Sequence, residues 1–250
     1  MTAYRTKAEL IIAVDDTDNP DQGGTGHVAR TIAQRLAPRL PVWGVSRHQF
    51  IILPEINYTR NNSGNAIHLL ALPQSLEDLA AEVASWVREL VLVGSEPGLC
   101  VAWPEALLEA QLGREAQRRF VTREEARSAA RAAGVVLLNP GEGDGGIVGA
   151  FGAACLASQG NDGRFVQIGQ MRDLSGQITV ADVLAAGADE VRAEDGTLLT
   201  EGTLSAERLR PALRAGKCVL YCRVGTDGRW TPLIGAPGDK GKEDAARVRG

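Results

Sequence analysis

The stretch AELIIAVDDTDNPDQGGTGHVARTIAQRL, residues 8–36, decides the fold prediction. Its first seven residues form a short apolar run that ends at a group of acids and glycines, which predicts a buried strand. From Gly26 onward, Val28, Ile32 and Leu36 recur four residues apart, which predicts a helix over residues 26–36. The expected order is therefore a buried strand, a polar loop rich in Asp and Gly, and a helix.

The same alternation continues along the chain. Thr122 and Glu125 predict a capping box at the start of a helix, and Gly134 predicts its end. Asp-Gly pairs after residue 187 predict β-hairpins, and the weakly apolar residues 237–250 predict a disordered tail. We expect strands over residues 42–53, 66–72, 99–103, 135–138 and 164–168, and helices over residues 75–93, from Pro104 onward, and over 122–133 and 147–158. This pattern predicts an α+β or mixed α/β fold.

Composition excludes several classes of protein. The 250 residues are 44% hydrophobic and 23% charged, which is too apolar for a disordered chain. No apolar run approaches the roughly 18 residues of a membrane span, and the N-terminus lacks a signal-peptide pattern, so we expect a cytoplasmic protein without membrane contact. The net charge of −4 argues against binding RNA through overall charge, although it leaves room for a local basic patch. Of the four cysteines only Cys218 and Cys222 are close, so a zinc ribbon is not expected.

Three carboxylates follow the first predicted strand: Asp15, Asp16 and Asp18. In open α/β folds ligands bind beyond the carboxyl ends of strands. Carboxylates so close together repel one another unless a cation neutralises them, and Mg²⁺ takes oxygen ligands and often phosphates as well. We therefore interpret these residues as metal ligands and catalytic groups, with a simple Asp-Gly turn as the alternative.

Glycines then lead from this acidic loop into the first predicted helix. Gly23, Gly24 and Gly26 would expose backbone N–H groups at a helix N-terminus, which favours a phosphate. Thr25 supplies a hydroxyl for metal or phosphate, and His27 begins the helix near the same place. One short segment thus predicts both a magnesium site and a phosphate cradle.

Two later loops carry further candidate ligands. The loop Asn139–Gly146 lies between a predicted strand and a tightly packing helix and could bind phosphate, although it has no Walker A lysine. The segment containing Arg60, Asn62 and Asn65 supplies amide and guanidinium donors for a phosphate or a base, or is simply a solvated loop. Arginines at 123, 127 and 131 fall on one helix face, where interleaved glutamates predict a salt-bridged surface.

Three segments in this order, VDDTDNPDQGGTG (14–26), TRNNSGNAI (59–67) and GDGGIVGAFGAA (143–154), resemble the archaeal tRNA-isoleucine 2-agmatinylcytidine synthetase family. The resemblance implies a kinase-like α/β domain over residues 1–64 and 135–185, with a ferredoxin-like α+β domain inserted over residues 65–134. Residues 186–236 would then form a small β-rich extension.

The same resemblance implies ATP and Mg²⁺ as cofactors. By position, Asp15, Asp16 and Asp18 would hold Mg²⁺ and the ATP phosphates, and Thr25 falls on the phosphate-accepting threonine. Arg60, Asn62 and Asn65 would approach nucleotide or substrate. Gly145, Gly146 and Gly149 would line the phosphates, and Gly145 replaces a basic residue of the family.

These observations predict an ATP- and Mg²⁺-dependent phosphotransferase or ligase. The family's OB-fold and zinc ribbon, which bind tRNA, have no counterpart among the motifs of this chain, so we expect a small-molecule acceptor. Three alternatives remain: an enzyme that modifies tRNA with a partner, a non-catalytic nucleotide-binding protein, and a haloacid-dehalogenase-like phosphatase. The last rests on Asp16-Thr17-Asp18, but Pro20 occupies the position where that class has Thr or Val.

Overall fold

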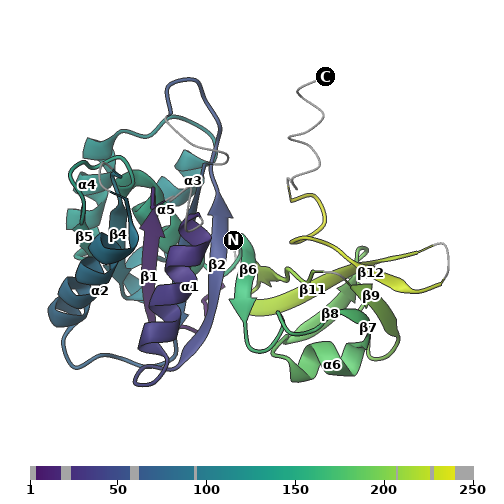
Figure 1. Ribbon diagram of the computed structural model, residues 1–250. Helices are drawn as coiled ribbons and strands as arrows, with labels where there is room; N and C mark the ends of the chain where they lie inside the picture. Colours follow the sequence, from purple (N-terminus) through teal and green to yellow (C-terminus); the bar gives the residue numbers. More distant parts are fainter. Residues whose placement is uncertain are drawn as a thin grey trace.

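The computed structural model describes residues 4–17, 24–56, 62–92, 95–206, 208–225 and 228–239. An α/β lobe built from the first part of the chain lies beside a smaller β-rich lobe (Figure 1). No helix within these residues is long and apolar enough to cross a membrane. Residues 240–250 of the predicted tail lie outside the described residues, whereas Asp239 is described and forms an ion pair with Arg214.

The first lobe is built on a split β-α-β arrangement. Its elements are β1 (Leu10–Asp15), α1 (Thr25–Leu36), β2 (Val42–Gln49), β3 (Ser63–Leu69), α2 (Leu76–Leu90) and β4 (Gly98–Ala102). The strands lie in the order β4-β1-β3-β2 and all neighbouring pairs are antiparallel, which is the ferredoxin-like topology. This strand order runs over residues 10–102, because β3 and β4 pair on either side of β1.

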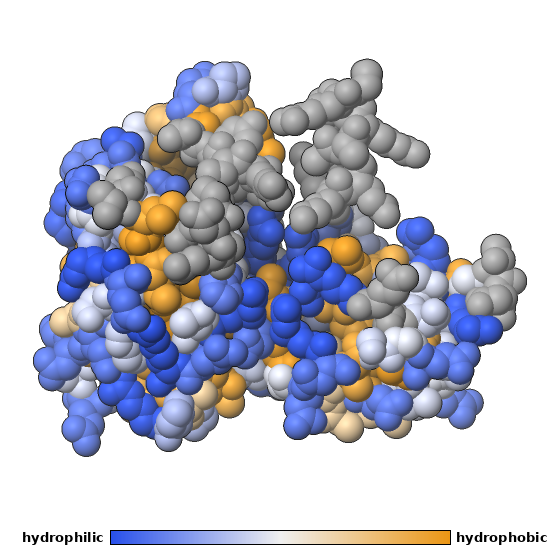
Figure 2. All heavy atoms as spheres, in the orientation of Figure 1, coloured by the Kyte–Doolittle hydropathy of each residue, from blue (hydrophilic) through white to orange (hydrophobic). Residues whose placement is uncertain are grey.

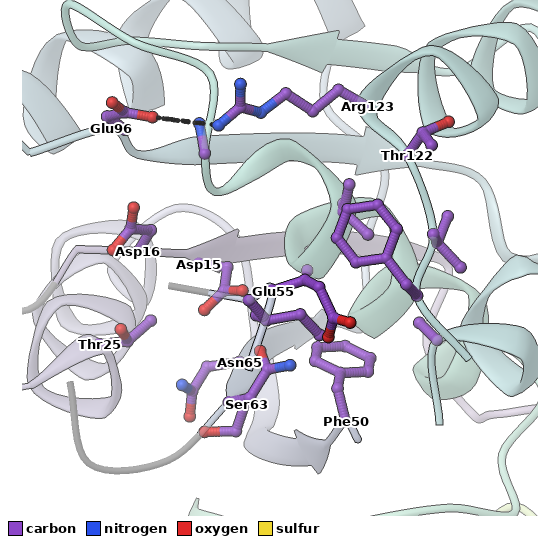
Figure 3. Close-up of a pocket in the computed structure, with 18 of the residues that line it drawn as sticks. Asp15, Asp16, Thr25, Phe50, Glu55, Ser63, Asn65, Glu96, Thr122 and Arg123 are labelled. Carbon is purple, nitrogen blue, oxygen red and sulfur yellow. Dashed lines mark hydrogen bonds and ion pairs between the residues drawn. The ribbon is translucent and has the colours of Figure 1, made fainter. Parts of the chain in front are cut away.

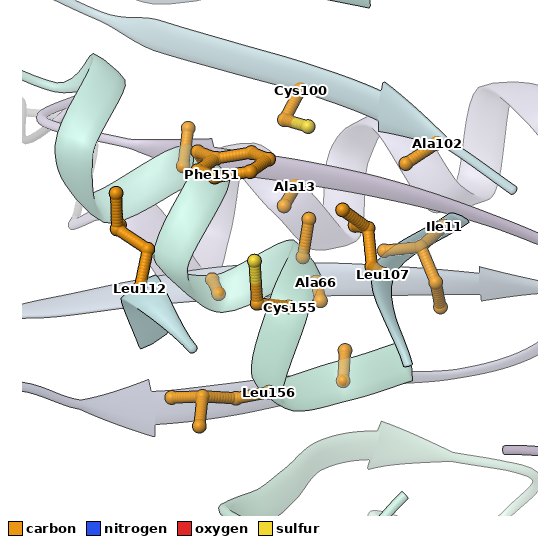
Figure 4. Packing of buried hydrophobic residues seen from close by; sticks show 14 of the residues in the cluster. Ile11, Ala13, Ala66, Cys100, Ala102, Leu107, Leu112, Phe151, Cys155 and Leu156 are labelled. Atoms are coloured by element: carbon orange, nitrogen blue, oxygen red, sulfur yellow. The ribbon is translucent and has the colours of Figure 1, made fainter. Parts of the chain in front are cut away.

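Helices cover both faces of this sheet. α1 and α2 pack on one face, where Leu10, Ile12 and Val14 of β1 point. The other face is covered by η1 (Pro104–Leu107), α3 (Leu112–Ala116), α4 (Arg123–Ala133) and α5 (Ile147–Ser158), while β5 (Val136–Leu138) extends the edge at β4. Since α5 is rich in Gly and Ala, it lies close to the sheet, where its Phe151 shares a core with Ile11 and Ala13 of β1 (Figure 4). The lobe therefore has three layers, with the sheet between α1 and α2 on one face and the helices packed around α5 on the other.

The second lobe continues the same sheet through β6 (Arg164–Ile168), which pairs with β2 and with β10 (Ala212–Arg214). Its other elements are β7 (Gly176–Thr179), α6 (Val180–Ala185), β8 (Glu190–Ala193), β9 (Thr203–Ala206), β11 (Lys217–Val224) and β12 (Trp230–Pro232). Residues such as Val191, Leu204 and Leu220 give it a core of its own. The chain thus has a large mixed sheet with helices, which agrees with the predicted α+β or mixed α/β fold. The predicted domain boundaries stay predictions.

Two local predictions were wrong. The predicted helix from Pro104 is a single 3-10 turn followed by the short α3. In one continuous helix Leu107 and Leu112 would lie about 140° apart, whereas here both pack into the core around α5. The segment Ser63–Asn65, predicted as part of a loop, begins β3 because it pairs with β2.

Candidate functional site

A pocket of about 810 Å³ opens where β1 ends and where α1 and α5 begin. Figure 3 shows Asp15, Asp16, Thr25 and Asn65 facing this space. Of the predicted site residues, it is lined by Asp15, Asp16, Gly24, Thr25, Gly26, Asn62, Asn65, Gly145 and Gly149. The structure therefore brings together three sequence segments that are far apart in the chain.

The two acids at the end of β1 face the start of α5. Asp15 closes the strand and pairs with Gly98 of β4. Its side chain lies against Gly149, where an added Cβ would be 2.6 Å from the Asp15 Cγ and nearer still to Oδ2. Asp16 follows with a φ of 51°, in the left-handed region that few non-glycine residues adopt. Such backbone strain is common at functional sites.

The helices that begin at this pocket lack side-chain caps. α1 and α5 start after Gly24 and Gly146, which have no side chain to accept from the first N–H groups. By contrast, α2, α4 and α6 are capped by Ser75, Thr122 and Thr179, each accepting a hydrogen bond from a backbone N–H three residues on. Uncapped N–H groups at a helix start attract anions. Both helix ends are therefore candidates for binding a phosphate, and at α5 the N–H groups of Gly145 and Gly146 bond Glu96.

Two buried polar atoms near the pocket also lack partners among the described residues. Asn65 is 1% exposed, and its Oδ1 has no hydrogen bond. The same atom would lie 3.5 Å from a Cβ placed on Gly26 at the start of α1. Thr17, directly after the two acids, has a buried and unpaired Oγ1. Because buried polar atoms are normally hydrogen-bonded, these atoms point to a ligand or ion beside β1.

The start of α5 is held by residues that the sequence analysis missed. Gly145 N–H donates to Glu96 Oε2 at 2.9 Å, and the Arg123 guanidinium lies 3.7 Å from that oxygen. Arg123 also pairs with Asp144 at 3.1 Å. A Cβ at Gly145 would be 2.7 Å from Glu96 Oε2 and 3.0 Å from Asp16 Oδ2. A side chain there would have to displace the Glu96 carboxylate, and the nearby guanidinium comes instead from Arg123 of α4.

Another part of the pocket carries apolar side chains beside polar ones. Phe50, Ile56, Phe120 and Val121 line it together with Val148 of α5. Phe120 is 45% exposed. The pocket therefore has one end rich in carboxylates and helix N-termini and another suited to a flat apolar group. The only local sign of this part of the pocket in the sequence was Phe120, an aromatic residue two positions before the helix N-cap Thr122.

The other predicted site residues fall elsewhere. His27 is exposed and does not line the pocket, and Gly146 lies behind it with its N–H bonded to Glu96 O at 2.8 Å. Asp18, Gly23 and Arg60 lie outside the described residues. In the part of the chain that the structure describes, no group of three His, Cys, Asp or Glu side chains is placed to hold a metal. The magnesium site thus stays a prediction that rests on Asp15 and Asp16.

A buried polar chain runs through the first lobe away from the pocket. Ser46 Oγ shares hydrogen bonds with His48 Nε2 at 2.8 Å and with His68 Nε2 at 2.7 Å, and His48 Nδ1 bonds Asp162 at 3.0 Å. Sequence spacing gave no hint of this Ser-His-Asp contact. Ser46 and both histidines are fully buried, so no substrate reaches them. Burial, with a smaller effect of His48, lowers the pKa of His68 to about 3, which keeps His68 neutral.

Comparison with known proteins adds a likeness in fold. No family model matches the chain, and no curated protein matches it. Among solved structures it is similar to TiaS in complex with an isoleucine tRNA and ATP, with 20% identity and a TM-score of 0.51, and to TiaS in complex with the same tRNA, AMPCPP and agmatine, with 19% identity and a TM-score of 0.50. Both matches cover 59% of this chain and 36% of the other. A tRNA fluorescent labeling enzyme matches over 58% of this chain and 35% of its own, with a TM-score of 0.51.

At these identities the likeness shows the fold alone. This chain spans about a third of the length of the proteins that it matches. The shared fold is a mixed α/β arrangement found in part of TiaS, a protein whose solved complexes contain tRNA, ATP and an ATP analogue.

Proposed function

We propose that this chain is an ATP- and Mg²⁺-dependent phosphotransferase or ligase-type enzyme that acts on a small-molecule acceptor. The observation that carries the proposal is the meeting of Asp15 and Asp16 with two helix N-termini that have no side-chain cap. Carboxylates alone favour a cation, and uncapped N–H groups alone favour an anion. A metal–nucleotide complex satisfies both at once.

Each part of the pocket has a role in this proposal. The first N–H groups of α1 and α5 bind the phosphates, and Asp15 and Asp16 would hold Mg²⁺, which neutralises phosphate charge. Arg123 adds positive charge at the start of α5, where Gly145 has none. Phe50 and Phe120 offer faces on which an adenine ring stacks. Positioning and charge neutralisation of this kind are what phosphoryl transfer requires.

Thr25 and an acid are the candidates for chemistry. Thr25 is the first residue of α1, lines the pocket and is 7% exposed. Its hydroxyl either accepts the phosphoryl group or binds the metal, and Asp15 or Asp16 takes the proton from the acceptor hydroxyl. Most of the predicted ligands that the structure describes lie within residues 1–64 and 135–185, the proposed kinase-like domain. Glu96, Phe120 and Arg123 come from the segment between them.

An RNA-modifying enzyme is the second candidate, favoured by the fold likeness to proteins solved with tRNA. The arginine face of α4 gives it little support, because Arg127 pairs with Asp144 and Arg131 with Glu124. As predicted from the sequence, that face is salt-bridged. The phosphatase alternative gains no support from Asp239, which pairs with Arg214 and does not line the pocket.

Calorimetry with ATP tests the proposal directly. The wild type should bind ATP in a Mg²⁺-dependent manner, and Asp16→Asn should lose that dependence. Glu77→Gln on the exposed side of α2 removes one carboxylate away from the pocket and should bind like the wild type. Absence of ATP binding by the wild type, with and without Mg²⁺, would refute the proposal.

A further inference from the structure

A second hollow, of about 230 Å³, lies in the β-rich lobe and is lined by Met171, Arg172, Leu174, Arg208, Leu209 and Arg210. Three of these six residues are arginines. Figure 2 shows hydrophilic residues gathered in the hollowed region between the two lobes. Neither the nucleotide pocket nor the resemblance of the sequence accounts for this concentration of positive charge.

Five arginines from both lobes come together at this place. Arg30 comes from α1, Arg164 from β6, Arg172 from the turn after β6, and Arg208 and Arg210 from the segment before β10. They are close enough to affect one another's ionisation. Burial, together with the charges of the other four arginines, lowers the pKa of Arg210 to about 10. Burial and the charges of Arg172 and Arg208 also lower the pKa of Arg30.

Within the described ranges none of these five arginines forms an ion pair with a carboxylate. Arg210 is 6% exposed, and its Nη1 donates to Leu209 O at 2.7 Å, while Arg172 donates to Val166 O at 3.1 Å. Burial lowers the pKa of Arg164 despite the opposing charge of Asp239, which is itself paired with Arg214.

The arginines of α4 provide the contrast within the same protein. There Arg123, Arg127 and Arg131 each have a carboxylate within 3.1 Å. A buried cation without a counter-charge is costly, and its retention implies that an anion completes the site. Among the described residues, Arg210 thus differs from the arginines of α4 in having no carboxylate partner.

We propose that these five arginines form an anion site for the phosphate group of a small phosphorylated ligand. Guanidinium groups bind phosphate through paired, charge-assisted hydrogen bonds. The hollow is small and Arg210 lies inside it, which suits a compact terminal phosphate. An RNA backbone would instead need an exposed basic track, and the chain as a whole is acidic.

The site adjoins the nucleotide pocket through α1. Arg30 Nη1 lies 3.5 Å from where a Cβ on Gly26 would be, and Gly26 lines the nucleotide pocket. A ligand held by its phosphate at the arginines would extend along α1 toward Thr25. The anion site therefore selects a phosphorylated small molecule as the acceptor, an assignment that rests on the proposed function.

The test uses inorganic pyrophosphate and ribose 5-phosphate, titrated without Mg²⁺ into the full chain and followed by calorimetry and thermal shift. The wild type should bind both compounds and be stabilised by them. Arg208→Met and Arg210→Met should each weaken binding tenfold or more. Arg131→Met removes one exposed, paired arginine from α4 and should bind like the wild type.

A purely structural role for Arg210 gives a different result. If the arginine only braces the lobe, Arg210→Met lowers the melting temperature without ligand, whereas removal of an unpaired buried charge should raise it or leave it unchanged. Arg208 is exposed, so its variant keeps the test valid if Arg210→Met does not fold.

Three outcomes would overturn the proposal: no binding of either compound by the wild type, an equal loss in Arg131→Met, or arginine-dependent binding of an RNA oligonucleotide only. Asp16→Asn separates this proposal from the nucleotide site. It should lose Mg²⁺-dependent ATP binding but keep pyrophosphate binding, whereas a failed anion site leaves ATP binding intact.

Discussion

Gly149→Ala should damage both the stability of the protein and its candidate site, against the usual effect of such a change. Inside a helix, replacing Gly by Ala normally stabilises by about 1 kcal/mol. Here the new Cβ would lie 2.6 Å from Asp15 Cγ and 3.0 Å from Asp15 Cβ, where ordinary contact begins at 3.4 Å. Either α5 must move off β1 or the carboxylate must turn away. Overpacking of this kind costs about 1–3 kcal/mol.

The expected net result is a loss of up to about 2 kcal/mol, which lowers the melting temperature by up to roughly 8 °C for a chain of this size. Because the displaced group is Asp15, we also expect Mg²⁺-dependent ATP affinity to fall about tenfold or more, a change equal to about 1.4 kcal/mol. Thermal unfolding and calorimetry measure the two effects on the same samples.

Gly26→Ala is the matched control for stability. It also lies in the first turn of a helix at the pocket, but its Cβ would meet Arg30 and Asn65 at an ordinary 3.5 Å. We expect it to leave the melting temperature unchanged or raise it by a few degrees. A Gly149→Ala variant that gains as much stability as Gly26→Ala would refute the close approach of α5 to Asp15 on which the site depends.

Three further predictions concern ionisation and catalysis. The pKa of His68 is about 3 in the folded protein against about 6.5 when unfolded, so its stabilising effect is complete above pH 6.5 and is lost as the pH falls toward 3. Denaturant unfolding at pH 7 and pH 5 should show the advantage of the wild type over His68→Gln shrinking by about 2 kcal/mol, and an unchanged difference would contradict the lowered pKa. Arg123→Gln should weaken ATP binding several-fold while stability changes by less than about 0.5 kcal/mol, because its ion pairs are exposed; equal affinity by calorimetry would remove Arg123 from the site. Thr25→Val should abolish phosphate transfer from labelled ATP while Thr25→Ser retains it, and full activity of the valine variant would exclude a role for the hydroxyl.

Local features of the fold followed from the sequence because short-range chemistry fixes them. The helix that starts at Thr122 has its capping box and ends at Gly134 in the left-handed conformation, as predicted. The strand and the helix within residues 8–36 were also predicted correctly. In each case the signal and the structure lie within a few residues of one another.

The missed features depend on residues far apart in the chain. Glu96, Phe120 and Arg123 reach the pocket only because β4, α4 and α5 pack together, and no spacing in the sequence encodes that meeting. The ferredoxin-like strand order likewise depends on which strands flank β1. Alternation of strands and helices predicts the layers, but not the neighbours within a sheet.

The charge at the start of α5 bears on whether the chain is an enzyme. The suggestion of a non-catalytic nucleotide-binding protein arose because Gly145 stands where the resembling family has a basic residue. In this structure Glu96 and Asp16 occupy the space that such a side chain would need. The Arg123 guanidinium approaches the same Glu96 carboxylate from α4. A guanidinium therefore reaches the start of α5 from another element, where it pairs with Glu96 and Asp144, and the glycine at 145 by itself does not decide between a nucleotide-binding protein and an enzyme.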